Sequence, residues 1–361
     1  MRKKIIPAIL ILILIFFIGR TAIRALNFVP FLFELIFNSE IKVKSENKRL
    51  NILLLGIGGE NHDGPNLTDT IMIASISPKN DKVTLISLPR DLWLSELNAK
   101  VNTAYSTGES KKKGGGIILS QAVVKKITNL QIDYTFRIDF NGFVKAVDLI
   151  GGLDVSVENS FDDFEYPIEG KENDPCGHKE EELEGLATAS SQLDAFPCRY
   201  EHLHFNKGLQ HMDGKTALQF VRSRHAKGTE GSDFARSKRQ EKIIKSFKDK
   251  VFSMQMFLNP VKFLDLYDVL SSSIDTNIKK EEFDDFLRLA QKLKAAEIKS
   301  VTLNVGDNLG NKEGLLINPE STNEYNYEWV LVPRIGNGNY SEIKEYLNCE
   351  IYKDDCIIKE I

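Results

Sequence analysis

The hydrophobic positions along the chain form two kinds of pattern, short β-branched runs and longer segments with helical spacing. Three runs near the start, Leu50–Leu55, Ile71–Ile76 and Val83–Leu88, have the length and composition of buried strands. The polar segment Ser77–Asp81 separates the second run from the third. Such a segment favours a tight turn, so these two runs are predicted to pair as a hairpin.

The rest of the pattern alternates between strands and helices. Further strands are predicted at 134–138, 153–157, 300–305 and 329–332, and helices at 117–128, 143–149, 214–221, 233–256, 281–294 and 341–347. The glycine-containing segments 56–66 and 111–116 are predicted to be loops. This alternation is typical of an α/β or α+β sandwich.

The first residues have the pattern of a membrane anchor. Residues 1–4 carry three cationic side chains, and residues 5–24 are almost entirely apolar. About 20 apolar residues span the hydrocarbon core of a membrane, and a cationic start keeps the N-terminus in the cytoplasm. We therefore expect a single-pass signal-anchor at 5–24, a membrane-proximal linker at 25–49 and an extracytoplasmic domain at 50–361. A cleaved signal peptide is the alternative, and it exports the same domain.

The cysteines fit export to an oxidising compartment. They form two sequence-local pairs, Cys176 with Cys198 and Cys349 with Cys356. This order favours a disulfide within each pair, although spacing alone permits three connectivities. A zinc site is the alternative, and it requires His178 or His202 as a further ligand.

The segment 158–206, which contains the first cysteine pair, differs from the rest of the chain. It includes the acidic stretch Glu180–Glu184 and has little periodic pattern. We interpret it as an insertion on the surface of the domain, tied by its disulfide. It is either a lid over the functional site or a solvated loop.

Overall charge narrows the class of function. The chain has 361 residues, a formal net charge of −4 and a pI near 6.0. Proteins that bind nucleic acid usually carry a basic excess. The balance of charge therefore argues against a nucleic-acid-binding function.

The predicted hairpin brings chemically useful side chains together. If its turn centres on residues 79–80, opposed residues have numbers that sum to about 159. Asp69, just before the first strand, then lies opposite Arg90, just after the second, with Asp91 beside it. Mg²⁺ is commonly bound by few carboxylates together with phosphate oxygens, so the pair of aspartates is a candidate metal site. The alternative is that Asp69 caps a turn and that Arg90 and Asp91 form a surface ion pair.

A second polar cluster is predicted around the start of the long helix at 233–256. Arg222 and Arg224 end the preceding helix, and Arg236 and Gln240 are spaced by four residues on the next one. Arginine suits bidentate phosphate binding, and the N-terminus of a helix favours an anion. The alternative is that these arginines form surface salt bridges with Asp233 and Glu241.

Several motifs in series resemble one known family. The motifs are Leu67–Met72, Leu88–Asp91, Lys100–Tyr105, Arg137–Phe143, Val147–Leu153, Gly208–Gly214, Val221–Arg224 and Asp233–Gln240. Their order and spacing, from about residue 50 to 250, are similar to those of the LytR-CpsA-Psr family. A series of motifs over such a length is far more specific than any one of them alone.

The resemblance implies a fold, a ligand and roles for the residues. The fold is a three-layer α/β/α-type sandwich around a central mixed sheet, and the ligand is a polyprenyl pyrophosphate. The residues implied to hold the pyrophosphate are Arg90, Arg222, Arg224, Arg236 and Gln240. Asp69 is implied to ligate Mg²⁺ (or Mn²⁺), with Asp91 beside it as a metal-shell or proton-accepting group.

Two departures from the family pattern concern the metal and the anion. Many members carry an aspartate, a second metal ligand, in the loop after the first strand, where this chain has Gly56–Gly59. Glu60 or Asp63 could supply that carboxylate. A further arginine that some members carry shortly after Arg90 is absent, because Leu92–Leu94 stands there.

The implied activity is that of a phosphotransferase that attaches a polyprenyl-pyrophosphate-linked anionic glycopolymer, such as teichoic acid or capsule, to peptidoglycan. A pyrophosphohydrolase acting on the same head group, and a non-catalytic lipid-binding or regulatory envelope protein, are the alternatives. The apolar segments 117–127 and 143–149 either line a pocket for the lipid or form ordinary core.

Overall fold

A computed structural model describes most of the chain that follows residue 48. The described residues are 41–43, 49–60, 62, 64–77, 79, 81–187, 189, 191–251, 253, 265–266, 269, 273–279, 282–307, 312–353 and 356. Within these ranges, every helix is too short or too polar to cross a bilayer. The predicted signal-anchor at 5–24 and most of the linker at 25–49 lie outside the described residues.

A mixed sheet of six strands forms the centre of the fold, in the order β11-β6-β1-β2-β3-β12. Its strands are β1 (Leu50–Ile57), β2 (Thr68–Ser77), β3 (Lys82–Leu88), β6 (Tyr134–Asp139), β11 (Ile274–Thr276) and β12 (Glu297–Thr302). Strand β1 pairs parallel with β6 and antiparallel with β2, and β3 pairs parallel with β12. The predicted mixed sheet is therefore confirmed.

The β2–β3 hairpin has the register that the turn predicts. Ile71 pairs with Leu88, and Met72 pairs with Ser87. The same register, continued by two residues beyond the end of β3, places Asp69 opposite Arg90. The length of the turn thus determines which residues lie opposite each other at the far end of the hairpin, because each residue added to the turn would shift the pairing.

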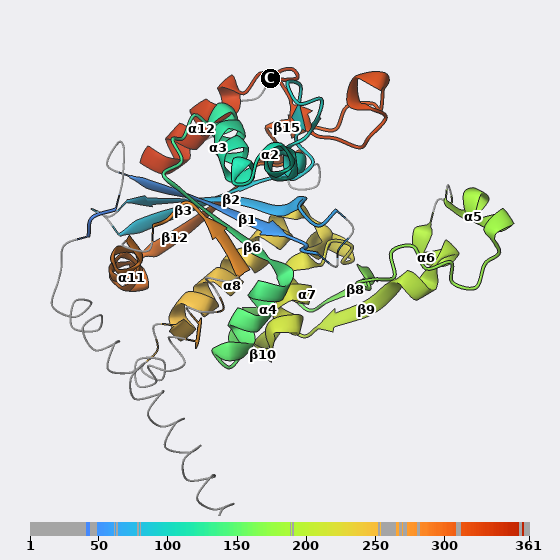
Figure 1. The fold of residues 1–361 in the computed structure, drawn as a ribbon, viewed down its shortest axis with the longest axis horizontal. Helices are drawn as coiled ribbons and strands as arrows, with labels where there is room; N and C mark the ends of the chain where they lie inside the picture. Colours follow the sequence, from blue (N-terminus) through green and yellow to red (C-terminus); the bar gives the residue numbers. More distant parts are fainter. Residues whose placement is uncertain are drawn as a thin grey trace, which may run out of the picture.

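Helices cover both faces of the sheet and give three layers (Figure 1). Above it lie α2 (Ala104–Lys111), α3 (Gly115–Thr128) and α12 (Ser341–Tyr352), and below it lie α8 (Asp233–Val251) and α11 (Phe283–Lys292). Helices α4 (Phe140–Leu149) and α7 (Gly214–Arg222) pack together beside α8. Helix α2 was not predicted, because its residues have only a weak apolar pattern.

Short elements complete the fold. The remaining strands are β4 (Trp93–Leu94), β5 (Ala99–Lys100), β7 (Leu153–Val157), β8 (Phe161–Pro167), β9 (Tyr200–Phe205), β10 (Gly208–Met212), β13 (Gly306–Asp307), β14 (Lys312–Glu313), β15 (Leu316–Ile317) and β16 (Val332–Pro333). The remaining helices are α5 (Glu180–Ala187) and α6 (Gln192–Ala195), with single 3₁₀ turns at 101–103, 197–199, 228–231, 293–295 and 323–325.

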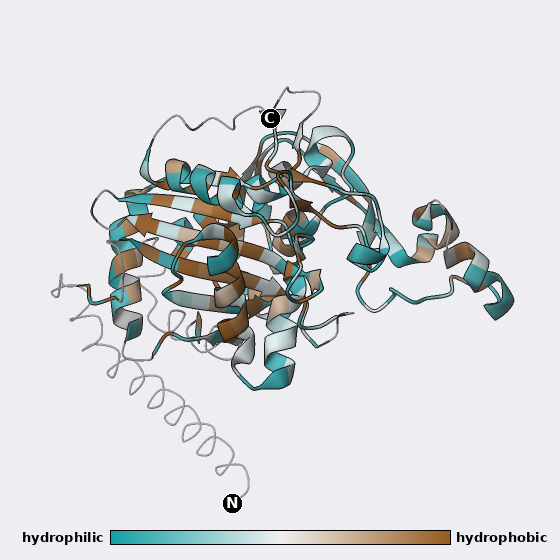
Figure 2. Cartoon of the chain, turned by 90° about the horizontal axis from the view of Figure 1, so that it is seen from above, coloured by the Kyte–Doolittle hydropathy of each residue, from teal (hydrophilic) through white to brown (hydrophobic). Residues whose placement is uncertain are grey.

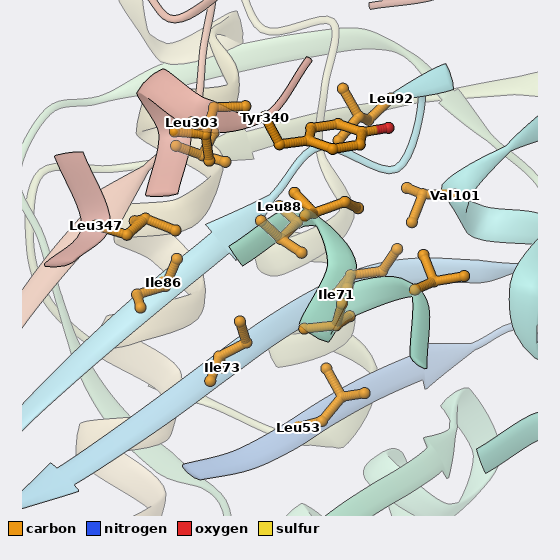
Figure 3. Packing of buried hydrophobic residues seen from close by; sticks show 14 of the residues in the cluster. Leu53, Ile71, Ile73, Ile86, Leu88, Leu92, Val101, Leu303, Tyr340 and Leu347 are labelled. Carbon is orange, nitrogen blue, oxygen red and sulfur yellow. The ribbon is translucent and has the colours of Figure 1, made fainter. Parts of the chain in front are cut away.

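The hydrophobic core divides between the two faces of the sheet, as alternation along a strand requires. Leu53, Ile73 and Ile86 face α3 and α12, whereas Ile52 and Met72 face the other layer. Figure 3 shows the first of these clusters, in which Leu347 of α12 packs over Ile86. In Figure 2 the strands are mostly brown and the outer helices mostly teal, so apolar surface is concentrated at the centre.

The segments predicted either to line a lipid pocket or to form core contribute largely to core. Ile117, Val124 and Ile127 of α3 are buried in the cluster above the sheet. Ala146 and Val147 of α4 belong to a separate cluster with β7 and α7. These contacts agree with the interpretation as ordinary core.

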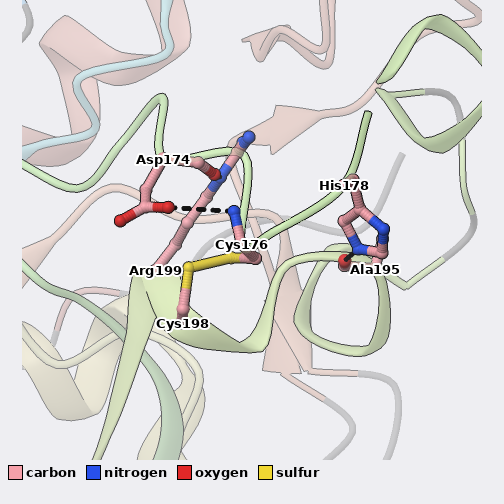
Figure 4. Close-up of a disulfide and its surroundings, with 6 residues drawn as sticks. All are labelled: Asp174, Cys176, His178, Ala195, Cys198 and Arg199. Carbon is pink, nitrogen blue, oxygen red and sulfur yellow. Dashed lines mark hydrogen bonds between the residues drawn. A yellow bond between two sulfur atoms is a disulfide. The ribbon is translucent and has the colours of Figure 1, made fainter. Parts of the chain in front are cut away.

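The predicted insertion is a hairpin of β8 and β9 that carries α5 and α6 at its far end. It extends away from the sheet (Figure 1). Cys176 and Cys198 form a disulfide at the base of these short helices, and Cys349 and Cys356 form the second disulfide. Figure 4 shows the first disulfide, with His178 turned toward the carbonyl of Ala195. Both predicted pairings are confirmed, and no cysteine is left to bind zinc.

The central strand β2 gives a direct test of the core. Ile73 is fully buried, so Ile73→Ala should lower the free energy of unfolding by about 2–5 kcal/mol, because it removes buried methyl groups and leaves a cavity. Ile118→Ala is the control, because Ile118 is 67% exposed and its loss should change stability by roughly 0.5 kcal/mol or less. Urea unfolding of both variants measures the difference. Equal destabilisation by the two changes would contradict the described packing.

Candidate functional site

The site begins with an ion pair between Asp69, the second residue of β2, and Arg90, two residues beyond the end of β3. Arg90 Nη1 donates to Asp69 Oδ1, as the hairpin register predicts. Both side chains are about a quarter exposed, at 29% and 25%. Arg90 Nε is buried and makes no hydrogen bond. The guanidinium is therefore held by Asp69, with its Nε facing the Asp91 carboxylate at 3.5 Å.

Asp91 is the centre of a cluster of positive side chains. Its carboxylate lies 3.5 Å from Arg90 Nε, 3.6 Å from Lys100 Nζ and 3.5 Å from Arg224 Nη2, and the residue is only 8% exposed. One buried carboxylate thus holds three cations from separate parts of the chain. Lys100 also pairs with Glu328 at 2.9 Å. Sequence reasoning did not assign Lys100 a role, although it lies in a motif that resembles the family.

Helix α8 adds Arg236 and Gln240 to the same end of the sheet. Both line a small cleft together with Asp69 and Thr70. Gln240 Nε2 donates to Thr70 Oγ1 at 3.1 Å. The cleft therefore joins the hairpin to the helix that the sequence predicted to bind phosphate.

Arg222 is fixed from three directions. Its Nη1 donates to the Tyr166 hydroxyl at 3.1 Å, and its Nη2 donates to His62 Nε2 at 2.8 Å. The guanidinium also lies 4.3 Å from the ring centroid of Phe140, a favourable cation–π distance. Burial raises the pKa of Tyr166, so its hydroxyl remains neutral beside Arg222 at neutral pH. Arg222 thus lies against the β1–β2 loop, the first turn of α4 and strand β8.

A buried carboxylate that sequence reasoning missed positions the segment between α7 and α8. Asp163 of β8 is fully buried. Its Oδ2 accepts from Ser223 Oγ at 2.6 Å and from the backbone N–H groups of Arg224 and His225 at 3.1 and 3.3 Å. Its Oδ1 accepts from the backbone N–H of Glu165 at 3.0 Å. Asp163 thus holds the backbone that presents Arg224.

Arg239 holds the same segment from the side of α8. Its Nη2 donates to the carbonyl of Ser223 at 2.7 Å, and its Nη1 lies 3.1 Å from Glu230 Oε2. Burial lowers the pKa of Arg239 to about 10, despite the opposing effect of Glu230. The side chain is still charged at neutral pH. Its contacts lie within the protein, so its role is structural and differs from that of its neighbours Arg236 and Gln240.

Comparison with known proteins identifies the family. The model of the LytR_cpsA_psr family matches residues 35–328. The chain belongs to the LytR-CpsA-Psr family. Among curated relatives, the polyisoprenyl-teichoic acid–peptidoglycan teichoic acid transferase TagU of Bacillus cereus is 26% identical over 253 residues, which cover 69% of this chain and 67% of that protein. TagU of Oceanobacillus iheyensis is 26% identical over 246 residues, 67% of this chain and 63% of that protein.

Solved structures of LytR-CpsA-Psr type share the fold. The crystal structure of Bacillus subtilis TagV has a TM-score of 0.54 and 22% identity, and the match covers 86% of this chain and all of that one. The structure of protein gbs0355 from Streptococcus agalactiae has a TM-score of 0.56 and 21% identity, covering 89% of this chain and 96% of that one. The arrangement of helices around a central mixed sheet is therefore that of this family.

The carboxylates at this end of the sheet suit a metal ion that phosphate helps to hold. Glu60 is exposed, and Asp63 lies outside the described residues. Among the described residues, the only three metal-ligand side chains that converge are Asp174, Cys176 and Cys198, and these cysteines are disulfide-bonded. Mg²⁺ in phosphoryl-transfer sites commonly needs only one or two carboxylates with phosphate oxygens. Asp69 fits that requirement as a ligand, because only its Oδ1 contacts a cation, Arg90, whereas both oxygens of Asp91 contact cations.

The role of Asp163 can be tested with its neighbour as a control. Asp163→Asn replaces one accepting oxygen with an amide that cannot accept a hydrogen bond, so at least one buried N–H or O–H loses its partner whichever way the amide turns. We expect a loss of about 2–4 kcal/mol in the free energy of unfolding. Asp162→Asn should have a much smaller effect, because Asp162 faces solvent and contacts His202 and His204. Denaturant titration at neutral pH measures both, and equal stability of the two variants would refute this role.

Proposed function

We propose that this chain is a phosphotransferase that moves a glycopolymer from a polyprenyl-pyrophosphate carrier onto peptidoglycan, with formation of a phosphodiester. The convergence of Arg90, Lys100 and Arg224 around Asp91 carries this proposal. A site with this surplus of positive charge suits a ligand with several negative charges. A pyrophosphate head group has that charge, and it offers oxygens to paired arginine donors.

The relatives support the choice of donor and acceptor. The curated relatives are named for transfer of teichoic acid from a polyisoprenyl carrier to peptidoglycan. One solved structure of the same fold, with a TM-score of 0.51 and 17% identity, is described as TagT bound to LI-WTA. We propose an anionic glycopolymer of this general kind, teichoic acid or capsule, as the substrate.

The proposed reaction is a substitution at phosphorus. An acceptor hydroxyl forms a bond to the phosphorus next to the sugar, and the bond from that phosphorus to the bridging oxygen breaks. The bridging oxygen leaves with polyprenyl phosphate, and the hydroxyl proton passes to Asp69 or Asp91. Arg90, Arg222, Arg224, Arg236 and Gln240 bind the phosphate oxygens. Asp69 would hold Mg²⁺ or Mn²⁺, whose charge offsets the charge of the pyrophosphate.

We also propose a place for this chemistry in the cell. Residues 5–24 would anchor the chain in the cell membrane, with the N-terminus in the cytoplasm and the site outside. The two disulfides support this proposal, because such bonds persist mainly in oxidising compartments. The anchor would keep the site close to the membrane in which the lipid carrier resides.

The experiment that tests the function uses the full-length chain with a synthetic polyprenyl-pyrophosphate-linked sugar and a peptidoglycan oligomer, with and without Mg²⁺. Metal-dependent formation of a phosphodiester-linked product is the expected result. Release of lipid monophosphate without a linked product would favour a hydrolase instead. Binding of the lipid without any turnover would favour a non-catalytic role.

Substitution of single arginines should distinguish arginines of the site from an arginine that only supports the fold. Arg90→Ala and Arg222→Ala should each lower the rate of transfer by about 100-fold or more, because each removes a cation that, in the proposed reaction, offsets negative charge on the phosphate oxygens. Arg49→Ala is the matched control. Arg49 contacts Ser75 at the opposite end of the sheet, so its loss should leave transfer nearly unchanged. Full activity of either site variant would exclude that arginine from the site.

A further inference from the structure

Two exposed aromatic side chains lie beside the site, on the loop formed by residues 322–331. Tyr327 is 72% exposed and Trp329 is 54% exposed, and the residue between them is Glu328. Glu328 Oε2 lies 2.9 Å from Lys100 Nζ, and Lys100 Nζ lies 3.6 Å from Asp91 Oδ1. The residue that separates the two aromatic rings therefore contacts the cation cluster of the site.

The fold of the loop depends on other residues. Its inward side chains form a small buried cluster, which consists of Trp93, Tyr325, Val330 and Val332. The N–H of Leu331 donates to the carbonyl of Asp91 at 3.0 Å, and its carbonyl accepts from the N–H of Trp93 at 2.8 Å. These contacts fix the loop to the site, and neither Tyr327 nor Trp329 contributes to them.

The backbone of Tyr327 has a conformation that a bulky side chain rarely adopts. Its φ is 58°, in the left-handed region, and Asn326 before it has a φ of 53°. Asparagine tolerates this region, whereas it destabilises a residue such as tyrosine. The N–H of Tyr327 donates to the carbonyl of Thr322 at 2.9 Å and holds the turn. Glycine would adopt the same turn without strain, so the fold alone does not account for tyrosine at this position.

Exposed aromatic rings that are held rigidly suit the binding of sugar rings. The C–H groups on one face of a sugar carry a weak positive charge, and the face of an aromatic ring is weakly negative. Stacking of the two also removes apolar surface of both from water. The carboxylates in the same segment can accept hydrogen bonds from sugar hydroxyls. A glycan is therefore a suitable occupant of this surface.

The charge of the segment narrows the occupant further. Residues 318–333 include Glu320, Glu324 and Glu328, all exposed, and no lysine, arginine or histidine. Lys100 offsets the charge of Glu328, so the other two glutamates give this surface its negative charge. A membrane surface with anionic lipids and an anionic donor polymer would both be repelled. The uncharged sugar rings of a glycan strand would not be.

We propose that Tyr327 and Trp329 bind sugar rings of the acceptor glycan strand and hold that strand beside Asp91. This inference rests on the proposed function, because it assigns to the acceptor a surface next to the site in which transfer occurs. It separates the two substrates by chemistry. The arginines bind the charged donor, and the aromatic pair binds the uncharged acceptor.

A binding experiment tests the surface without any need for transfer activity. The chain has two tryptophans, and Trp93 is only 1% exposed, so a fluorescence change on addition of a sugar reports on Trp329. Titration of the full-length chain with chitopentaose, an uncharged N-acetylglucosamine oligomer, should give a saturable change. Tyr327→Gly should weaken this binding about 10-fold, because one stacked ring is lost. Its thermal midpoint should not fall, because the same change relieves the left-handed backbone.

Tyr327→Phe is the conservative variant, and Tyr352→Ala is the matched control. The first keeps the ring and should bind chitopentaose within about 2-fold of the wild-type affinity, since stacking needs no hydroxyl. Tyr352 is 56% exposed, and its ring lies 5.6 Å from the guanidinium of Arg49, which lies at the opposite end of the sheet from the site. Its loss should leave binding unchanged. Absence of chitopentaose binding, or equal binding by wild type and Tyr327→Gly, would overturn the inference.

A kinetic experiment places the surface in the reaction. The full-length chain and the lipid-linked donor are reconstituted in vesicles of phosphatidylethanolamine and phosphatidylglycerol, and the peptidoglycan oligomer is added outside. Trp329→Ala with Tyr327→Gly should raise the KM for the acceptor by about 10-fold or more and change the KM for the donor by about 2-fold or less. A rise in the donor KM alone would show that the rings contact the membrane, and the inference would fail.

The two experiments distinguish failure of the inference from failure of the proposed function. Absence of a linked product from the wild-type chain, together with chitopentaose binding that Tyr327→Gly weakens, would overturn the proposed function and leave a glycan-binding surface. A linked product whose acceptor KM is the same in wild type and the double variant would overturn only the inference.

Discussion

Mutual repulsion among positive side chains is the constraint on which the rest of the site depends. Arg90, Lys100 and Arg224 come from three separate segments, and in water they would not remain close together. Asp91 makes their proximity stable, because its buried carboxylate contacts all three. Asp69 holds Arg90 from the other side. The fold can therefore keep these positive side chains together without a bound anion, which would reduce the reorganisation that the proposed binding requires.

The surrounding structure fixes the backbone that presents these charges. Strand pairing fixes Asp69 relative to Arg90, whereas the segment after α7 is not held by strand pairing. Asp163 and Arg239 hold that segment instead, through hydrogen bonds to Ser223, Arg224 and His225. The exposed parts of the site thus rest on buried polar groups. Such networks are strong when every member is satisfied and costly when one is lost.

The sequence predicts much of the site because its key contacts follow from local rules. Hairpin register alone brings Asp69 to Arg90, and helical spacing puts Arg236 and Gln240 on one face of α8. The position of Asp163 could not be predicted in this way. It lies in a segment of irregular composition, and its partners are about 60 residues away, so only the folded chain brings them together. Lys100 was missed for the same reason, since the chain path that places it beside Asp91 is not encoded in any periodic pattern.

The inserted hairpin projects from the domain, and its base also positions residues of the site. Consecutive residues of β8 face opposite ways, so Asp163 points inward to the arginine-bearing segment and Asp162 points outward to His202 and His204. A deletion of one residue near the start of β8 would exchange these two faces and turn Phe164 toward the backbone that now rests on a carboxylate. The far end of the hairpin, with its own disulfide, is free of that restriction. Insertions and deletions can therefore be tolerated at the tip of the hairpin, whereas a change of one residue at its base would alter which residues face the site.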